Sequence, residues 1–318
     1  MQGITFTKKG YKMKILTKIL TLLLILSMLL SAVSCDDKTG NDDTDKDDGT
    51  TQSEKTTYTV KVLSPVGTPL SDVLVYVHKG DADFGLVGMG VRTNKAGEAS
   101  FLLESAEDYS VQLDDLPEKY IAKSGLTRAD RYDMGTNVVT VSVEFNPEYN
   151  PAVYTLGDKI ADFTLTDIGG TEYSLYDLLK TKDMVMLNFW FVGCPPCAAE
   201  FPAINSAYKT FKKDIEILAI NDYPSDTSSS VGSYSENKGF GLEMPLFKVS
   251  RDSSPIHINR FENGGYPTTV IIDRNGVICF VHSGAVPSEE LWSNAFAYFT
   301  AENYTTTLFK SITEIPTV

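Results

Sequence analysis

Cys194 and Cys197 are separated by two prolines, and this spacing is the feature of the sequence that most directly indicates chemistry. The apolar run 184–191 before them predicts a buried strand, and the residues after them predict an amphipathic helix. A helix N-terminus supplies the sharp turn that lets two such thiols close a small ring. It also directs unpaired N–H groups and the positive end of the helix dipole at the first sulfur. Because such a site favours the thiolate, which attacks disulfides, the pair predicts thiol–disulfide exchange.

Zinc binding and an inert structural disulfide are the alternative uses of this pair. A closed zinc site needs four ligands, which usually come from a second pair of cysteines or histidines. The remaining candidate ligands are single residues scattered along the chain: Cys35, Cys279, His78, His257 and His282. Redox chemistry is therefore the favoured interpretation, with no metal and no cofactor beyond a Cys194–Cys197 disulfide.

Three further motifs accompany the pair: residues 157–163 lie before it, residues 190–202 surround it, and residues 265–273, with an Asn-Gly turn after them, follow it. Together they resemble the TlpA/ResA-like branch of the thioredoxin superfamily, whose members are extracytoplasmic thiol–disulfide oxidoreductases. The resemblance covers about residues 152–302. It implies an α/β thioredoxin-like domain, and the alternation of predicted strands and helices over this stretch agrees with that fold class. The predicted helices include one over residues 256–261 and a last one that Ser288 caps.

The position of each residue on the predicted helix suggests its role. Cys194 lies at the N-terminus of the predicted helix and is expected to be the nucleophile. Cys197 lies one turn further into the helix and is expected to resolve the mixed disulfide. Asn188 stands where ordinary thioredoxins carry a buried aspartate, so that position cannot titrate. Glu200 occupies the position of a glutamate that the resembling family places near its cysteines, which implies a proton-handling role. A first-turn carboxylate that only complements the helix dipole is the alternative.

Tyr266 and Pro267 precede a predicted strand. In the resembling family the matching proline is cis and lies beside the cysteines, and the backbone around Tyr266 is implied to pair with the substrate polypeptide. The alternative is a plain turn before a strand. Gly193 departs from the family, because most relatives carry tryptophan immediately before the first cysteine. We expect this loss to expose the cysteine pair and to loosen the loop.

The N-terminus predicts the compartment. Five lysines lead into the apolar run 19–30, small residues follow, and Cys35 comes next. This pattern resembles a bacterial lipoprotein signal peptide over residues 1–34, cleaved before a lipidated Cys35, and cleavage by ordinary signal peptidase is the alternative. Residues 35–56 then predict a disordered acidic tether, whose acidic run is also a hypothetical signal for sorting to the cell surface. The chain is therefore expected to be a membrane-anchored, extracytoplasmic protein of the cell envelope.

The charge balance excludes some partners. The chain carries 28 Lys and Arg against 42 Asp and Glu, and loss of the five lysines ahead of Cys35 takes the net charge from −14 to −19. Such a balance argues against nucleic acid and anionic lipid headgroups as partners.

Two domains are expected after the tether. Residues 57–145 contain five β-rich segments separated by turn signals, at 58–62, 73–77, 99–103, 109–113 and 138–143, which predicts an all-β sandwich. This stretch resembles prealbumin-like, Cna-B or carboxypeptidase-regulatory modules, and it serves either as a spacer or in substrate recruitment. Residues 146–151 predict a short linker, 152–302 the thioredoxin-like domain and 303–318 a C-terminal tail. Cys279, in a predicted strand, is interpreted as a core thiol, with a third redox partner as the alternative.

These features predict a membrane-tethered enzyme that reduces or isomerises disulfides of exported proteins. The resemblance further implies electrons from a membrane thiol reductase and a link to cytochrome c maturation. A peroxiredoxin-type peroxidase is disfavoured, because Phe191 stands where its threonine or serine is required. A non-catalytic surface-binding lipoprotein is disfavoured because both cysteines are retained.

Overall fold

The computed structural model describes residues 54–79, 86–105, 107–123, 131–135, 137–262 and 264–318. The predicted signal peptide, Cys35 and nearly all of the predicted tether lie outside these residues. Strand β1 begins at Lys55, two residues inside the segment expected as tether. Within the described part of the chain, none of the helices is both long enough and apolar enough to cross a membrane.

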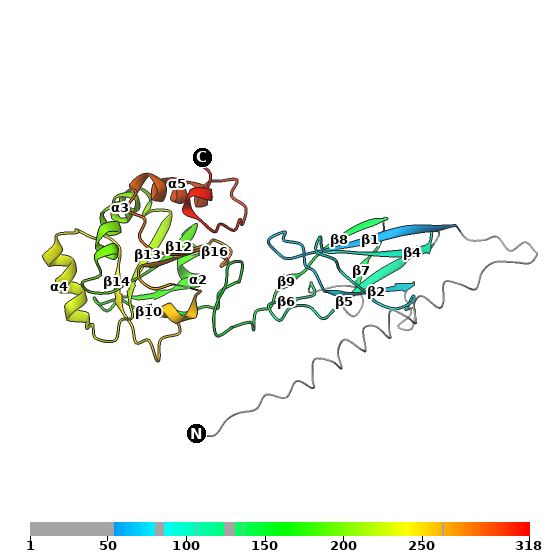
Figure 1. Cartoon of the computed structure of the whole chain (residues 1–318), viewed down its shortest axis with the longest axis horizontal. Helices are drawn as coiled ribbons and strands as arrows, with labels where there is room; N and C mark the ends of the chain where they lie inside the picture. The colour runs from blue at the N-terminus through cyan, green and yellow to red at the C-terminus, as the bar shows by residue number, and fades with distance from the viewer. Residues whose placement is uncertain (1–53, 80–85, 106, 124–130, 136, 263) are drawn as a thin grey trace, which may run out of the picture. The chain divides into compact units, whose positions relative to one another are not determined.

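The N-terminal region of the described chain is built only of β-sheets (Figure 1). One sheet has the order β4-β1-β8, with β1 antiparallel to β4 and parallel to β8. A second sheet has the order β3-β2-β5-β7, and a short pair joins β6 to β9. The strands are β1 (Lys55–Leu63), β2 (Leu74–Lys79), β3 (Val91–Arg92), β4 (Glu98–Glu104), β5 (Tyr109–Asp114), β6 (Tyr120–Ile121), β7 (Arg131–Asp133), β8 (Val138–Ser142) and β9 (Glu144–Phe145).

Alternating side chains join the two larger sheets into one core. In β1, Tyr58, Val60 and Val62 are buried while the residues between them are partly exposed, which is the pattern of a strand with one buried face. They share a core with Val75 of β2 and Val111 of β5. The sequence predicted five strands here, and all are present. It did not predict β3, β6, β7 and β9, because two or three residues are too few to display alternation.

The C-terminal region is an α/β domain around a mixed sheet of order β14-β13-β12-β15-β16. The strands β12, β13 and β14 are parallel, whereas β15 and β16 run antiparallel to their neighbours. Their bounds are β12 (Met184–Trp190), β13 (Ile215–Asn221), β14 (Leu246–Lys248), β15 (Thr268–Asp273) and β16 (Ile278–Ser283). Because every residue of β12 and β13 is buried, these strands form near-continuous apolar runs in the sequence.

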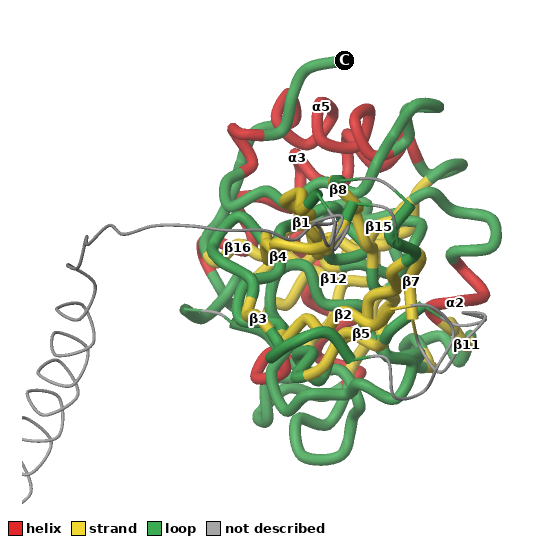
Figure 2. Tube along the Cα trace, turned by 90° about the vertical axis from the view of Figure 1, so that its right-hand side faces the viewer, coloured by secondary structure: helices red, strands yellow, loops and turns green. Residues whose placement is uncertain are grey.

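Helices cover both faces of this sheet. On one face lie α3 (Pro195–Phe211), α4 (Ser228–Lys238) and α5 (Glu289–Phe299), with α3 and α5 side by side (Figures 1 and 2). On the other lie α2 (Leu175–Leu178), the hairpin of β10 (Thr164–Thr166) with β11 (Glu172–Ser174), and the 3₁₀ turn Ile258–Arg260. The α/β prediction is confirmed, although residues 256–261 form only a 3₁₀ turn where a helix was expected.

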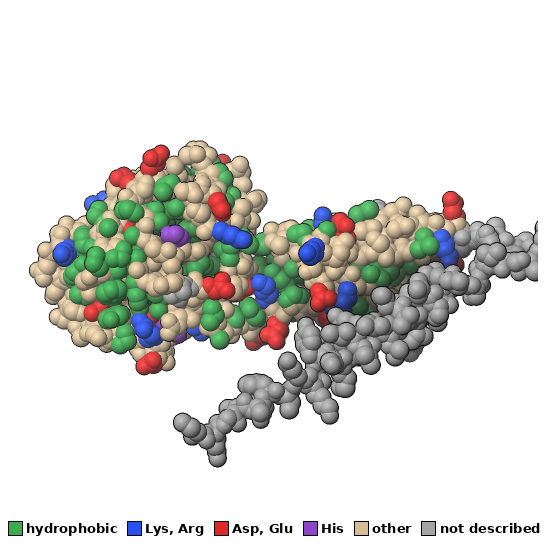
Figure 3. Space-filling view, viewed as in Figure 1, with side chains coloured by type: hydrophobic (Ala, Val, Ile, Leu, Met, Phe, Trp, Pro, Cys, Tyr) green, Lys and Arg blue, Asp and Glu red, His purple; other side chains and the backbone are tan. Residues whose placement is uncertain are grey.

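The segment expected as a C-terminal tail, 303–318, packs onto the α/β domain. The N–H of Phe309 donates to the carbonyl of Cys279 at 2.9 Å, and Phe309, Ile312 and Ile315 are buried in the domain's core. A short 3₁₀ turn, Ile312–Glu314, is capped by Ser311. On the face drawn in Figure 3, single acidic and basic side chains lie interspersed among apolar and neutral ones.

Candidate active site

The redox pair lies where β12 leads into α3, as its spacing predicts. Cys194 and Cys197 form a disulfide with their Cα atoms 5.3 Å apart. Cys194 is the N-cap of α3, and its Sγ accepts a hydrogen bond from the N–H of Cys197 at 3.2 Å. Pro195 begins the helix, where a missing N–H costs no hydrogen bond. The first sulfur therefore sits at the positive end of a long helix.

Both cysteines are almost completely buried, so the expectation that Gly193 exposes them is wrong. Cys194 exposes 1% of its surface and Cys197 none. Gly193 adopts φ +84°, a left-handed conformation that suits glycine, and it leaves open space where a side chain would be. Phe191, Val192 and Tyr266 pack against the core cluster to which the buried pair belongs.

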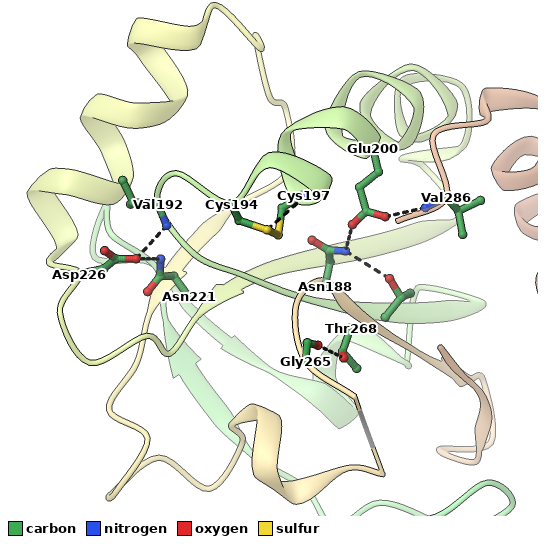
Figure 4. Close-up of a disulfide and its surroundings, with 11 residues drawn as sticks. Asn188, Val192, Cys194, Cys197, Glu200, Asn221, Asp226, Gly265, Thr268 and Val286 are labelled. Atoms are coloured by element: carbon green, nitrogen blue, oxygen red, sulfur yellow. Dashed lines mark hydrogen bonds between the residues drawn. A yellow bond between two sulfur atoms is a disulfide. The ribbon is translucent and has the colours of Figure 1, made fainter. Parts of the chain in front are cut away.

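Glu200 lies one turn after Cys197 on α3 and is completely buried. Its Oε1 accepts from Nδ2 of Asn188 at 2.9 Å, and its Oε2 accepts from the N–H of Val286 at 3.0 Å (Figure 4). Burial raises the pKa of Glu200 from its usual 4.5 to about 7, an effect that the two hydrogen bonds only partly offset. A carboxyl with this pKa exchanges its proton near neutral pH, unlike an exposed first-turn carboxylate.

Asn188 connects Glu200 to the opposite strand. Its Nδ2 also lies 3.2 Å from Oγ1 of Thr269 in β15, since Asn188 and Thr269 are directly paired across the two strands. The sequence indicated Asn188 and Glu200, but it gave no signal for Thr269 or Val286. Those two come from strands and loops far away in the chain, and only the fold brings them together.

The Tyr266–Pro267 peptide bond is cis, as the resemblance implied. Thr268, the next residue, pairs with Phe189 in β12. The loop before β15 and the cysteine loop after β12 therefore lie at the same end of the sheet. On the other side of this turn, the carbonyl of Pro267 accepts from the N–H of Gly284 at 2.9 Å.

Comparison with known proteins identifies the α/β region. Residues 156–281 match the model of the AhpC/TSA family. The thiol-disulfide oxidoreductase ResA of Geobacillus kaustophilus is 36% identical over 137 residues, which is 43% of this chain and 74% of that protein. The chain belongs to the ResA-like thiol–disulfide oxidoreductases. ResA of Bacillus subtilis is 32% identical over 131 residues, 41% of this chain and 68% of that protein.

A solved structure extends the comparison. The thioredoxin domain of a thiol-disulfide oxidoreductase from Bacteroides vulgatus is 22% identical, with a TM-score of 0.38, and covers 46% of this chain and 98% of that one. The family match begins at residue 156, so the β-rich region ahead of the ResA-like domain is unidentified.

A hydrogen-bonded clamp holds the loop before the cysteines in this ResA-like domain. Oδ2 of Asp226 accepts from the N–H of Val192 at 2.8 Å and from Nδ2 of the buried Asn221 at 2.7 Å (Figure 4). Asp226 comes from the loop after β13, and sequence reasoning did not find it. An aspartate in a Ser-rich loop carries no local sign that it reaches a neighbouring strand.

Cys279, the third cysteine that the structure describes, is a free thiol buried in β16. Its Sγ lies 3.4 Å from the hydroxyl of Tyr304. Burial, with the charge of Asp273, raises the pKa of Cys279 well above its usual value, so it persists as a thiol. In the described part of the chain, no three His, Cys, Asp or Glu side chains are grouped to hold a metal ion.

Proposed function

We propose that this ResA-like protein is a membrane-tethered, extracytoplasmic enzyme that reduces or isomerises disulfides of exported proteins. The observation that carries the proposal is the Cys194–Cys197 disulfide at the N-terminus of α3, one helical turn from the buried carboxyl of Glu200. This arrangement combines a sulfur that is stabilised as a thiolate with a group that titrates near neutral pH.

Reduction of a client disulfide starts from the dithiol form. The Cys194 thiolate attacks one client sulfur, the client S–S bond breaks, and the other client sulfur leaves and takes up a proton. Cys197 then attacks Sγ of Cys194, which releases the second client sulfur and leaves the Cys194–Cys197 disulfide. Two electrons pass to the client in this sequence.

Glu200 supports the second step. Cys197 is the deeper sulfur and must lose a proton before it attacks. With a pKa of about 7, Glu200 accepts that proton at the pH of the exchange. Tyr266 and Pro267, at the edge of the sheet where β12 ends, are the proposed contacts for the client backbone.

The electron donor and the location of the enzyme extend the same proposal. A membrane thiol reductase returns the Cys194–Cys197 disulfide to the dithiol, and cytochrome c maturation is one process that such a reductant serves. Lipidated Cys35 anchors the chain in the membrane of the cell envelope, and residues 36–54 act as the tether. The β-rich region, which begins with β1 at Lys55 and ends at Phe145, is proposed to be a prealbumin-like sandwich that spaces the enzyme from the membrane, ahead of the linker 146–151.

Trapping in cells tests the enzymatic proposal. A Cys197→Ala variant cannot resolve the mixed disulfide, so it should accumulate covalent adducts with exported proteins. The Cys194→Ala/Cys197→Ala double variant is the matched control and should form none. A Cys197→Ala variant that forms no adduct with any exported protein would refute the proposal.

Mass spectrometry of the mature protein tests the anchor. We expect an N-terminal Cys35 that carries acyl chains. A mature protein that begins at Cys35 without acyl mass would refute the lipid anchor and would indicate a secreted enzyme instead.

A further inference from the structure

Three aromatic rings gather at the end of the sheet where the cysteine loop follows β12. They are Phe191, three residues before Cys194, Tyr223, two residues after β13, and Tyr266, immediately before the cis proline. Phe191 stacks on Tyr223 with ring centroids 4.8 Å apart, and it meets Tyr266 edge to face at 5.2 Å. Tyr223 and Tyr266 are 6.1 Å apart. We call these three residues the aromatic cradle.

The sheet topology explains why the rings meet there. The parallel strands β12 and β13 end at one edge of the sheet, and the antiparallel β15 begins at that edge. Each strand therefore contributes one ring at the point where the cysteine loop emerges. The carbonyl of Phe191 also accepts a hydrogen bond from the N–H of Cys194 at 3.2 Å, so the backbone of one cradle residue is bonded to that of the reacting cysteine.

The cradle is partly exposed, whereas Cys194 is buried. Tyr223 exposes 37% of its surface, and Phe191 and Tyr266 are half-buried. Cys194 exposes 1%. The cradle is continuous with the exchange site through the backbone of Phe191, and this continuity identifies the client polypeptide as the occupant.

A buried carboxylate fixes the third ring. Asp222 is completely buried and accepts from the hydroxyl of Tyr266 at 2.5 Å, from the N–H of Ile258 at 2.9 Å and from Nε of Arg251 at 3.4 Å. Arg251 also contacts the Tyr266 hydroxyl. A buried carboxylate needs such partners, and here they hold the ring in one orientation. Because the Tyr266 hydroxyl is already engaged, this ring offers a client apolar surface rather than a hydrogen bond.

We propose that the aromatic cradle selects clients that carry a large apolar or aromatic side chain next to the disulfide cysteine that Cys194 attacks. Asp222 acts as a positioning residue, since it reaches the client only through Tyr266. The inference rests on the proposed function, because it assumes that the enzyme reduces protein disulfides. Ring–ring contacts in offset or edge-to-face geometry favour an aromatic side chain at this position.

Two peptides with one disulfide each test the proposal. They are identical except for the residue beside the attacked cysteine, which is Trp in one and Ser in the other. In single turnovers, for which the full-length reduced protein supplies both electrons, we expect kcat/KM to favour the Trp peptide by about 10-fold, the scale on which apolar pockets discriminate. Equal values would overturn the cradle, whereas no reduction of either peptide would overturn the proposed function instead.

Variants test whether the rings cause the preference for the Trp peptide. Tyr223→Ala should bring the ratio of the two kcat/KM values close to one, and Tyr223→Phe, which keeps the ring, should restore it. Asp222→Asn should reduce the ratio mainly through KM for the Trp peptide. The matched control is Ile168→Ala, because Ile168 is another apolar residue of this domain with 37% exposure, and it should leave the ratio unchanged. A ratio that survives Tyr223→Ala refutes the proposal.

Discussion

Glu200 makes the stability of the oxidised protein depend on pH in a direction opposite to that of most carboxylates. Burial raises its pKa from 4.5 to about 7, and at roughly 1.4 kcal/mol per pKa unit this corresponds to about 3 kcal/mol. Because the folded state holds this proton more tightly than the unfolded chain, the associated stability is fully present below pH 4.5. It is lost as the pH rises through 7. Between pH 5 and pH 8 we expect this carboxyl alone to lower the free energy of unfolding by about 2.5 kcal/mol.

Glu200→Gln isolates this effect. The amide cannot titrate, so the variant should lose this pH-dependent part of the stability. Its absolute stability is also expected to fall by about 1–3 kcal/mol, because an amide presents one acceptor where the carboxylate presents two to Asn188 and Val286. The difference between the two pH values separates the titration from this constant loss.

Urea denaturation followed by tryptophan fluorescence is a suitable assay. The chain has two tryptophans, Trp190 and Trp292, and both lie in the core of the ResA-like domain, so the signal reports on that domain. The control is Glu243→Gln, because hydrogen bonding to Lys212 lowers the pKa of Glu243 and its removal should not alter the difference between pH 5 and pH 8. If Glu200→Gln and the wild type show the same difference, the assignment of a raised pKa to Glu200 is refuted.

Three further predictions concern the surroundings of the disulfide. In Cys197→Ala, the rate of alkylation of Cys194 should rise with pH with a midpoint below the usual thiol pKa of about 8.5, because the sulfur caps a helix. A midpoint at or above that value would contradict stabilisation of the thiolate by the helix. Asp226→Ala should slow exchange with a peptide disulfide and cost about 1–3 kcal/mol of stability, measured by urea denaturation, whereas Asp226→Asn keeps an acceptor oxygen and should approach the wild type. Cys279 should resist modification by maleimide in the native protein and become reactive when residues 303–318 are deleted. Equal reactivity in the two proteins would show that this segment does not cover Cys279.

Local patterns predicted much of the α/β domain from sequence. The apolar runs of β12 and β13 are long and completely buried, and Ser288 caps α5 as expected. The cysteines and Glu200 were also visible, because a helix fixes how residues three apart lie relative to each other.

Long-range contacts were not predictable in the same way. Asp222 and Asp226 come from the loop after β13 and Val286 comes from the loop after β16, and each contacts a residue that is far away in sequence. The burial of Cys194 was missed for the same reason. The glycine before it suggested exposure, but Cys194 belongs to a core cluster against which Tyr266 packs. Tyr266 is 72 positions further along the chain and reaches this cluster through the pairing of β12 with β15.

Ordinary thioredoxins carry a buried carboxylate at the position of Asn188, whereas this chain carries one at Glu200, and this difference has a physical reason. Asn188 donates its Nδ2 hydrogen to Glu200, and an ionised aspartate at 188 could only accept, so it would face Glu200 as a second buried negative charge. Among the residues that the structure describes, Glu200 is the carboxyl that accepts a hydrogen bond from this amide. Once the disulfide is reduced, a Cys197 thiolate one turn away would again place two negative charges in apolar surroundings. In the proposed mechanism the carboxyl is then protonated when Cys197 is ionised, which would couple the proton on Glu200 to the attack that regenerates the disulfide.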